Sequence, residues 1–224
     1  MTVTAIIVAA GRGNRANAPE GENIAKQWRD VAGKRVIDHT LDAFRSHPRI
    51  DHIVLVLHAD DIEQAPQVSG LITAAGGADR AASVRAGLDA VPEGTRLVLI
   101  HDVARPCVHS DTISNVIDAL NQNDGAAPAL AVTDALWTGQ NGLVNGTQDR
   151  TGLFRAQTPQ GFAFDAIKRA HATYGTGAAD DVEVARAAGI NVAIVAGDED
   201  NLKITYPADF DRAARILCAR KEFS

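Results

Sequence analysis

The apolar residues of this chain gather into short continuous runs that are separated by segments with helical spacing. Runs of Val, Ile, Leu and Ala without polar breaks are typical of strands buried on both faces of a sheet. The first run ends in a glycine-containing loop, which is the usual exit of a buried strand. The predicted strands are Val3–Val8, His52–Leu57, Leu71–Ala75, Arg96–Ile100, Ala126–Val132 and Val192–Val195.

Between these runs, apolar residues recur every three or four positions, which indicates amphipathic helices. In Lys34–Phe44, for example, Val36 and Leu41 fall on one helical face. Ser110 or Asp111 is the expected N-cap of a later helix, because short polar side chains accept hydrogen bonds from the first free N–H groups. The predicted helices are Lys34–Phe44, Ala81–Leu88, Asp111–Leu120, Phe164–Thr173, Asp180–Ala188 and Pro207–Ala219.

Strands that alternate with helices favour a mostly parallel sheet with helices on both faces, an α/β fold. Two segments interrupt the alternation. Thr133–Asn145 is rich in glycine and asparagine and predicts an extended excursion, within an arm of about residues 133–150. Gln157–Phe162 predicts a compact loop around its proline. We find no repeat or linker, so we predict a single domain over residues 1–224.

Composition narrows the class of protein. With 224 residues, 46% of them hydrophobic, the chain can bury a substantial core. A net charge of −6 disfavours general nucleic-acid binding, because a phosphate backbone selects a basic face. The two cysteines, Cys107 and Cys218, lack the spacing of a zinc site, and without a secretory leader they fit the reducing cytoplasm. No apolar run approaches the roughly eighteen residues of a membrane span.

Glycines and charged residues gather where the predicted strands end. In an open α/β sheet, ligands bind beyond the carboxyl ends of the strands. The first strand runs into Ala9–Arg15, whose small residues let backbone N–H groups approach phosphate oxygens. The third strand ends at Gly76–Arg80, which Ser83 follows, and the fourth ends at His101–Pro106. We therefore expect these segments to form one site.

Asp102 is the best candidate for a carboxylate that binds Mg²⁺, because magnesium prefers few protein oxygens together with phosphates and water. The alternative is that Asp102 caps its strand or pairs with Arg105. Asp79 and Arg80 could form no more than an ion pair at a helix start. His101 is expected to be structural, because no nucleophile accompanies it.

Several cations could serve phosphate chemistry. Transfer at a phosphorus centre requires positioning and fixed positive charges rather than a covalent intermediate. Each of these cations could equally be a solvated surface charge, and the sequence leaves open whether they converge. The candidates are Arg15, Lys26, Arg105, Arg150 and Lys203.

An ordered set of motifs runs nearly the whole length of the chain. The motifs are AAGRGNR at Ala9–Arg15, Lys26-Gln27, Gly76–Ser83, HDVARP at His101–Pro106, DRTGLFRAQTPQGF at Asp149–Phe162, Asp180-Asp181 and DNLKIT at Asp200–Thr205. In this set the chain resembles the 2-C-methyl-D-erythritol 4-phosphate cytidylyltransferase family of the non-mevalonate isoprenoid pathway. The resemblance implies a Rossmann-like nucleotidyltransferase fold, CTP and Mg²⁺ as co-substrates, and a homodimer whose protruding arm reaches the partner's active site.

The resemblance also implies a reaction, the transfer of CMP from CTP to methylerythritol phosphate with release of pyrophosphate. Arg15 and Lys26 would stabilise the pentacoordinate transition state at the α-phosphorus, and Arg150 and Lys203 would position the acceptor. Arg105 and Thr158 would bind the sugar phosphate. The nucleotide would be held by Ala9, Ala10, Gly11, Arg12, Gly13, Gly77 and Ser83, with Asp102 near the metal.

The chain departs from the pattern of that family in three places, one of which is Ala179 in place of a common threonine before Asp180. The loop between Arg15 and Lys26 is longer than usual, and Ala25 replaces a proline. In the arm, Ala135 and Trp137 stand where the family has a threonine and a lysine, so a hydroxyl and a cation are missing. Two alternatives therefore stay open: a cytidylyltransferase for another polyol or sugar phosphate, and a nucleotide-binding homologue without turnover.

Overall fold

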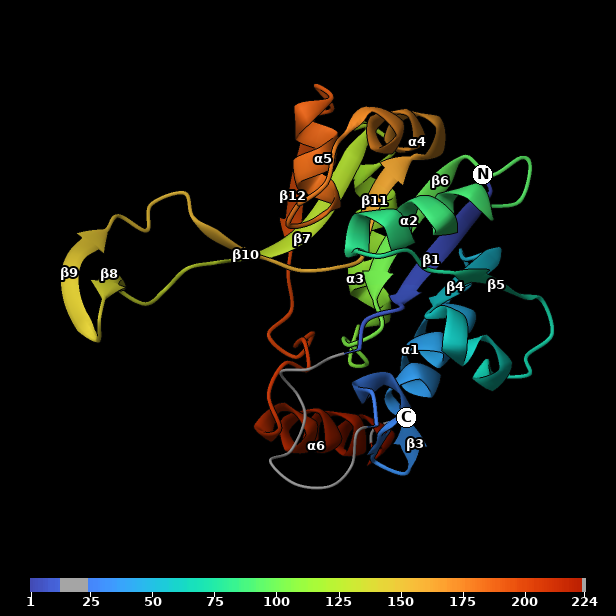
Figure 1. Cartoon of the computed structure of the whole chain (residues 1–224), viewed down its shortest axis with the longest axis horizontal. Helices are drawn as coiled ribbons and strands as arrows, with labels where there is room; N and C mark the ends of the chain where they lie inside the picture. The colour runs from blue at the N-terminus through green and yellow to red at the C-terminus, as the bar shows by residue number, and fades with distance from the viewer. Residues whose placement is uncertain (13–23, 223–224) are drawn as a thin grey trace.

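A central sheet with helices on both faces forms the body of the chain, and a hairpin projects from it (Figure 1). The structure is a computed structural model that describes residues 1–12 and 24–222. The strands of the main sheet are β1 (Val3–Ala9), β4 (His52–Leu57), β5 (Leu71–Ala75), β6 (Leu97–Asp102), β7 (Gly125–Ala131), β10 (Phe154–Ala156), β11 (Gln160–Ala163) and β12 (Val192–Ala196).

The strand order of this sheet is β10-β7-β11-β6-β1-β4-β5, and β12 pairs with β7. Strands β6, β1, β4 and β5 are mutually parallel, so their carboxyl ends meet at one edge. The predicted loop at Gln157–Phe162 is wrong in part, because β11 runs antiparallel between β6 and β7. A Cβ at Gly161 would come within 2.6 Å of Val116. Pairing with β6 and β7, rather than a local apolar pattern, therefore determines the strand conformation of this short segment.

Helices cover both faces of the sheet, and alternate residues of β1 serve the two sides. Ala5 and Ile7 face a core that includes the apolar side of α1 and α3, whereas Ile6 faces a core shared with α2, α4 and α5. Burying one such aliphatic side chain contributes about 1.5–3 kcal/mol. The helices are α1 (Val36–Arg45), α2 (Arg80–Asp89), α3 (Ser110–Ala119), α4 (Phe164–Thr173), α5 (Asp181–Ala187), α6 (Ala208–Glu222), and the 3-10 turns η2 (Lys26–Trp28) and η3 (Ala59–Gln64).

Two predicted helix starts need correction. Helix α1 begins at Val36 rather than Lys34, because Lys34-Arg35 forms strand β3 (Lys34–Arg35), which pairs with β2 (Asp30–Val31). The N-cap of α3 is His109, whose Nδ1 accepts a hydrogen bond from the backbone N–H of Asp111 at 3.2 Å.

Within the described part of the chain, every helix is too short or too polar to cross a membrane.

The predicted arm is a two-stranded hairpin of β8 (Leu136–Gln140) and β9 (Leu143–Gln148) that pairs only with itself within the described chain. Asn141 and Gly142 connect the strands with positive φ values of 54° and 79°, the conformation of a tight Asn-Gly hairpin turn. The hairpin stands well clear of the body (Figure 1). Its apolar side chains Trp137 and Leu143 are consequently exposed.

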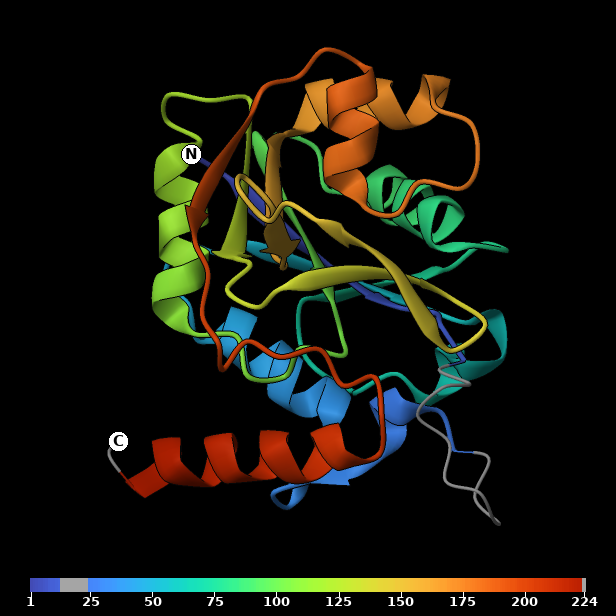
Figure 2. The ribbon, with the colours of Figure 1, turned by 90° about the vertical axis from the view of Figure 1, so that its left-hand side faces the viewer.

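Helix α6 lies beneath the sheet body, alongside α1 (Figure 2). Phe210 and Ala213 of α6 share an apolar cluster with Val36 of α1 and with Leu202 and Ile204 of the preceding loop. This cluster fixes the loop that carries Lys203 against the body, between the carboxyl edge of the sheet and α6.

Candidate active site

A cleft of about 410 Å³ opens at the carboxyl edge of the sheet, where β1, β5 and β6 end. The topology places it there because parallel strands end together. Among the predicted site residues of the described chain, those that line the cleft are Ala9, Ala10, Gly11, Arg12, Lys26, Gly77, Ser83, Asp102 and Lys203. Gly13 and Arg15 lie outside the described residues.

Close packing explains the glycines on the β5 side of the cleft. A Cβ at Gly76 would collide with the Cβ of Ala10, and a Cβ at Gly77 would collide with Ala82. The Ser83 hydroxyl accepts a hydrogen bond from the Gly77 N–H at 3.2 Å and donates to the Asp79 carbonyl at 2.9 Å. The cleft wall is thus held in shape by its own backbone, and only glycine fits there.

Arg12 projects from the β1 loop toward η3. Its Nη2 donates to Asp60 at 2.6 Å and contacts His58 Nδ1 at 2.8 Å, while Nη1 pairs with the buried Asp61 at 3.3 Å. These contacts tie the β1 loop to η3, and His58, the N-cap of η3, lines the cleft. The guanidinium of Arg12 is therefore already oriented before any ligand arrives.

Asp102 and Lys203 form the centre of the cleft. The Nζ of Lys203 lies 2.7 Å from Oδ2 of Asp102, although the two residues come from β6 and the loop before α6. Burial alone would raise the pKa of the Asp102 carboxyl, but the charges of Arg80 and Lys203 outweigh burial and hold it well below its usual value. The carboxylate is therefore ionised at neutral pH.

Lys26 enters the same cleft from η2. Its Nζ donates to the carbonyl oxygen of Ile204, next to Lys203, at 3.1 Å. The neighbouring Gln27 is buried and donates from Nε2 to the Ala9 carbonyl at 3.1 Å, which ties η2 to the end of β1. Residues that are far apart in the sequence therefore bring two ammonium groups to one cleft.

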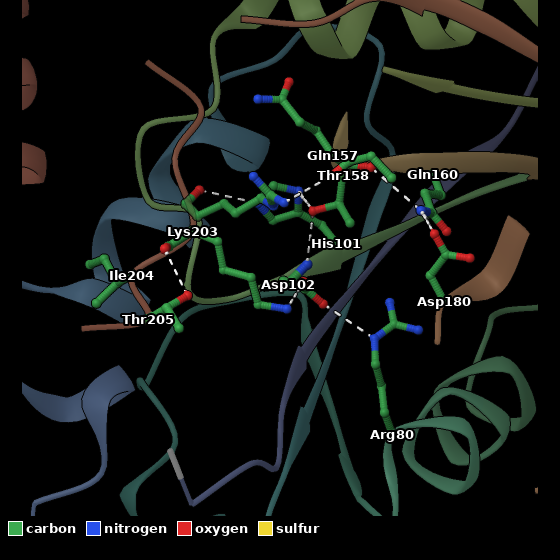
Figure 3. A network of polar contacts seen from close by, with 12 residues as sticks. Arg80, His101, Asp102, Gln157, Thr158, Gln160, Asp180, Lys203, Ile204 and Thr205 are labelled. Carbon is green, nitrogen blue, oxygen red and sulfur yellow. Dashed lines mark hydrogen bonds and ion pairs between the residues drawn. The ribbon is translucent and has the colours of Figure 1, made fainter. Parts of the chain in front are cut away.

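A buried chain of hydrogen bonds supports Asp102 from behind, as Figure 3 shows. The Asp102 N–H donates to Thr158 Oγ1 at 3.2 Å, and Thr158 Oγ1 lies 3.0 Å from Nδ1 of His101. His101 Nε2 faces the Arg105 carbonyl at 3.2 Å, so a neutral imidazole protonated on Nε2 satisfies every member. Burial lowers the pKa of His101 to about 3, which agrees with the expected structural role.

Arg105 and Thr158 do not line the cleft as the sequence suggested. Arg105 is 9% exposed and donates to the carbonyl oxygens of Asn201 at 2.6 Å and Ala156 at 3.2 Å. Thr158 is buried in the hydrogen-bond chain of His101. Burial could not be read from the local sequence, because an arginine after a strand end is usually exposed. Their contact with a sugar phosphate stays a prediction, and it requires these internal hydrogen bonds to be exchanged.

Arg150 lies at the base of the arm, outside the cleft lining. Its Nη1 donates to the carbonyl oxygen of Thr133, in the segment that leads into β8, and the side chain faces solvent. Of the predicted catalytic residues, the structure therefore brings Lys26 and Lys203 together and keeps Arg150 apart.

The sequence interpretation missed the role of Arg80. Instead of pairing with Asp79, Arg80 donates to Asp102 from Nε at 3.3 Å and to Asp181 from Nη2 at 2.8 Å. Asp79 is the N-cap of α2 and accepts from the Ala82 N–H at 2.7 Å. The alternative pair of Asp102 with Arg105 is also wrong, since the ion-pair partners of Asp102 are Arg80 and Lys203. The position of Arg80 just beyond a strand end was the available signal.

The described residues contain no cluster of three or more His, Cys, Asp or Glu side chains that could hold a metal ion alone. Two carboxylates of the described chain line the cleft, and that of Asp79 is engaged as the N-cap of α2. Asp102 is therefore the carboxylate that fits Mg²⁺ bound mainly through phosphate oxygens.

Comparison with known proteins decides the family. The model of a family described as 2-C-methyl-D-erythritol 4-phosphate cytidylyltransferase matches residues 3–219. This chain belongs to that family. The resemblance inferred from the motifs and the α/β nucleotidyltransferase fold are thereby confirmed.

Relatives of the family match over nearly the whole chain. The 2-C-methyl-D-erythritol 4-phosphate cytidylyltransferase of Roseobacter denitrificans is 59% identical to this chain. The match covers 98% of this chain and 99% of that relative. A bifunctional enzyme IspD/IspF of Ruegeria pomeroyi is 61% identical over 97% of this chain, which spans 57% of that relative. The crystal structure of the 2-C-methyl-D-erythritol 4-phosphate cytidylyltransferase from Thermus thermophilus superposes with a TM-score of 0.82 at 31% identity, covering 97% of this chain and 100% of its own.

Proposed function

We propose that this chain transfers CMP from CTP to 2-C-methyl-D-erythritol 4-phosphate, which yields 4-diphosphocytidyl-2-C-methyl-D-erythritol and pyrophosphate. The observation that carries the proposal is the cleft in which Lys26, Lys203 and Asp102 meet at the carboxyl edge of the sheet. Membership of the cytidylyltransferase family indicates which nucleotide and which acceptor the cleft would bind.

The chemistry follows from charge. A phosphate monoester is largely ionised near neutral pH, so an acceptor phosphate oxygen can attack the α-phosphorus of CTP without a general base. Negative charge then grows on the oxygens around phosphorus and on the leaving pyrophosphate. Lys26 and Arg15 stabilise this charge, whereas Lys203 and Arg150 orient the acceptor phosphate. The role of Arg15 rests on the AAGRGNR motif alone.

Mg²⁺ is the proposed cofactor, which would bind together with CTP. Asp102 would hold it together with triphosphate oxygens, because its carboxylate is ionised and lines the cleft. The ion would neutralise the negative charge of the triphosphate and of the pyrophosphate that leaves. In the ligand-free state, Lys203 and Arg80 balance the charge of Asp102.

We also propose a homodimer in which the arm of each chain completes the cleft of the other. Arg150 does not line the cleft of its own chain, and within the described residues nothing covers the arm side chains Trp137, Leu143 and Val144, which are exposed. A second copy supplies both a cover for these apolar residues and a use for Arg150.

Cytoplasmic location completes the proposal. Cys107 and Cys218 are free thiols in the structure, which agrees with a reducing compartment.

One assay tests the reaction. The purified chain is mixed with CTP, Mg²⁺ and 2-C-methyl-D-erythritol 4-phosphate, and pyrophosphate release is followed with and without EDTA. Release that EDTA abolishes is the expected result. Ribitol phosphate replaces the acceptor in a parallel reaction. Release with ribitol phosphate alone favours a cytidylyltransferase for another polyol phosphate, the alternative that Trp137 in the arm supports, and CTP binding without any release identifies a homologue without turnover.

Mixed variants test the exchange of arms. Lys26→Ala damages a cleft and Arg150→Ala damages an arm, so each homodimer is expected to be nearly inactive. After equal amounts are refolded together, half of the dimers are mixed and each has one intact site, which restores about a quarter of the native activity. Activity equal to the sum of the two separate variants would show that each chain uses its own arm or none.

A further inference from the structure

A line of charged side chains leads from the cleft into the body of the protein, between α2 and α5. Arg80 contacts Asp102 in the cleft, as Figure 3 shows, and its other end pairs with Asp181. Oδ1 of Asp181 in turn lies 3.1 Å from Nε2 of His171 on α4. The side chains of Asp181 and His171 are 0% and 2% exposed, so this line is closed to solvent beyond Arg80.

The backbone around Asp181 is fixed from β11. Gln160 Oε1 accepts hydrogen bonds from the N–H groups of Asp181 at 3.0 Å and Val182 at 3.1 Å. Gln160 Nε2 donates to Asp180 at 2.8 Å, and Asp180 caps α5 through the Glu183 N–H at 3.0 Å. The first turn of α5 is therefore locked to the sheet, and the position of the Asp181 carboxylate is set by the backbone rather than by a flexible side chain.

In this arrangement the guanidinium of Arg80 donates hydrogen bonds to two carboxylates. Nη2 donates to Asp181, and Nε donates to Oδ1 of Asp102. Oδ2 of Asp102 then remains for Lys203, at 2.7 Å. An arginine with only one carboxylate near it prefers to bind both of its oxygens with two parallel N–H groups. Without Asp181, Arg80 would therefore take both oxygens of Asp102 and compete with Lys203.

The electrostatics agree with this division. Burial disfavours the charge on Arg80, but Asp181 and Asp102 outweigh burial and raise its pKa. A buried carboxylate is stable only when it is paired and hydrogen-bonded, and Asp181 has Arg80 and His171 as partners. Neither the proposed reaction nor the cytidylyltransferase motifs assign a task to the ion pair of Asp181 with Arg80.

We propose that Asp181 is a positioning residue of the active site: it holds Arg80 so that Asp102 presents one oxygen to Lys203 and to the metal-bound nucleotide. The helical layer of α4 and α5 thereby takes part in the reaction without touching substrate. The proposal rests on the proposed function for its kinetic consequence, but not for its structural one.

The test is Asp181→Asn, with Glu183→Gln as the matched control. Both changes remove one negative charge from the first turn of α5, but the exposed Glu183 side chain contacts Tyr174 and the Ala179 N–H rather than Arg80. For Asp181→Asn we expect kcat to fall about tenfold or more and the Mg²⁺ concentration for half-maximal rate to rise severalfold, with little change in the KM for CTP. The control is expected to keep the native kcat and Mg²⁺ dependence.

A crystal structure of ligand-free Asp181→Asn gives a readout that is independent of turnover. We expect both oxygens of Asp102 to accept from Arg80 and the contact between Asp102 and Lys203 to open beyond about 4 Å, the usual limit of an ion pair. An unchanged pair of Asp102 with Lys203 would overturn the proposal, whatever the assay shows. If the unaltered chain releases no pyrophosphate, the proposed function fails, and the crystal structure still decides the role of Asp181.

A second variant guards against misfolding of Asp181→Asn. Arg80→Lys keeps a positive charge between the two carboxylates but cannot span them, so the same loss of kcat and the same shift in Mg²⁺ dependence are expected. Thermal unfolding of each variant gives its folded fraction. A loss of activity that only follows the folded fraction, with native kcat per folded molecule, would show that the pair is merely structural.

Discussion

Asp102 in the cleft and Trp137 on the arm have opposite surroundings. The Asp102 side chain is 13% exposed and contacts Arg80, Lys203 and Thr158, all from its own chain. Trp137 is 68% exposed on a hairpin whose strands pair only with each other in the described chain. The groups of the cleft are held by contacts within their own chain before substrate binds, which is what electrostatic stabilisation of a transition state requires. The arm acquires such contacts only from a second surface, so the two regions should respond differently to mutation.

The largest effect is expected in the cleft. Lys26→Ala removes a fixed positive charge from the place where charge develops, so kcat should fall about a hundredfold or more. Steady-state pyrophosphate release measures the effect. Lys34→Ala is the matched control, because Lys34 is an exposed lysine of β3 that pairs with Asp42. A change confined to KM would contradict the role given to Lys26.

A second effect concerns the pH dependence of stability, through the buried His101 beneath the cleft. Unfolded His101 takes up a proton near its ordinary pKa, whereas burial lowers the pKa of native His101 to about 3. Between these values the unfolded state binds more protons, so the free energy of unfolding declines as the pH falls below about 6.5. Burial also lowers the pKa of His47, which adds to the same trend.

His101→Gln removes the contribution of His101 but keeps that of His47. From pH 7 to pH 5, the native chain should lose roughly 2 kcal/mol more unfolding free energy than the variant. Urea unfolding at both pH values provides the measurement. Equal losses in the two proteins would show that native His101 takes up its proton over the same pH range as unfolded His101, and would contradict the lowered pKa.

The smallest effect is expected on the arm. Trp137→Lys restores a cation near the proposed acceptor site of the partner, at an exposed position where a charge pair contributes at most about 1 kcal/mol. The KM for 2-C-methyl-D-erythritol 4-phosphate should therefore fall up to about fivefold, while the KM for CTP stays the same. An unchanged acceptor KM would mean that the arm does not limit acceptor binding in this chain.

Local pattern was sufficient for most of the sheet. The predicted strands His52–Leu57 and Leu71–Ala75 have the bounds of β4 and β5, since a continuous apolar run can be satisfied only by burial on both faces. Strand β11 escaped prediction because its four residues owe their conformation to pairing with β6 and β7. A short segment carries too little pattern to reveal partners that arrive from elsewhere in the chain.

Motif and strand order likewise placed Lys26, Gly77, Asp102 and Lys203 at one edge of the sheet, as the structure has them. Arg105 carried the same type of signal, yet its side chain is buried and bound to two carbonyl groups. A sequence states which charges exist, but the exposure of each depends on what packs over it.

The sequence by itself determined the alternation of strands and helices, the edge at which a ligand binds and the chemistry of that edge, because these follow from apolar periodicity and residue type. Only the tertiary structure decided which charges meet. Arg80 and Asp181 lie 101 positions apart, and so do Asp102 and Lys203. Their pairing depends on how α5 and the loop before α6 pack against the sheet, and long-range packing has no local signature in the chain.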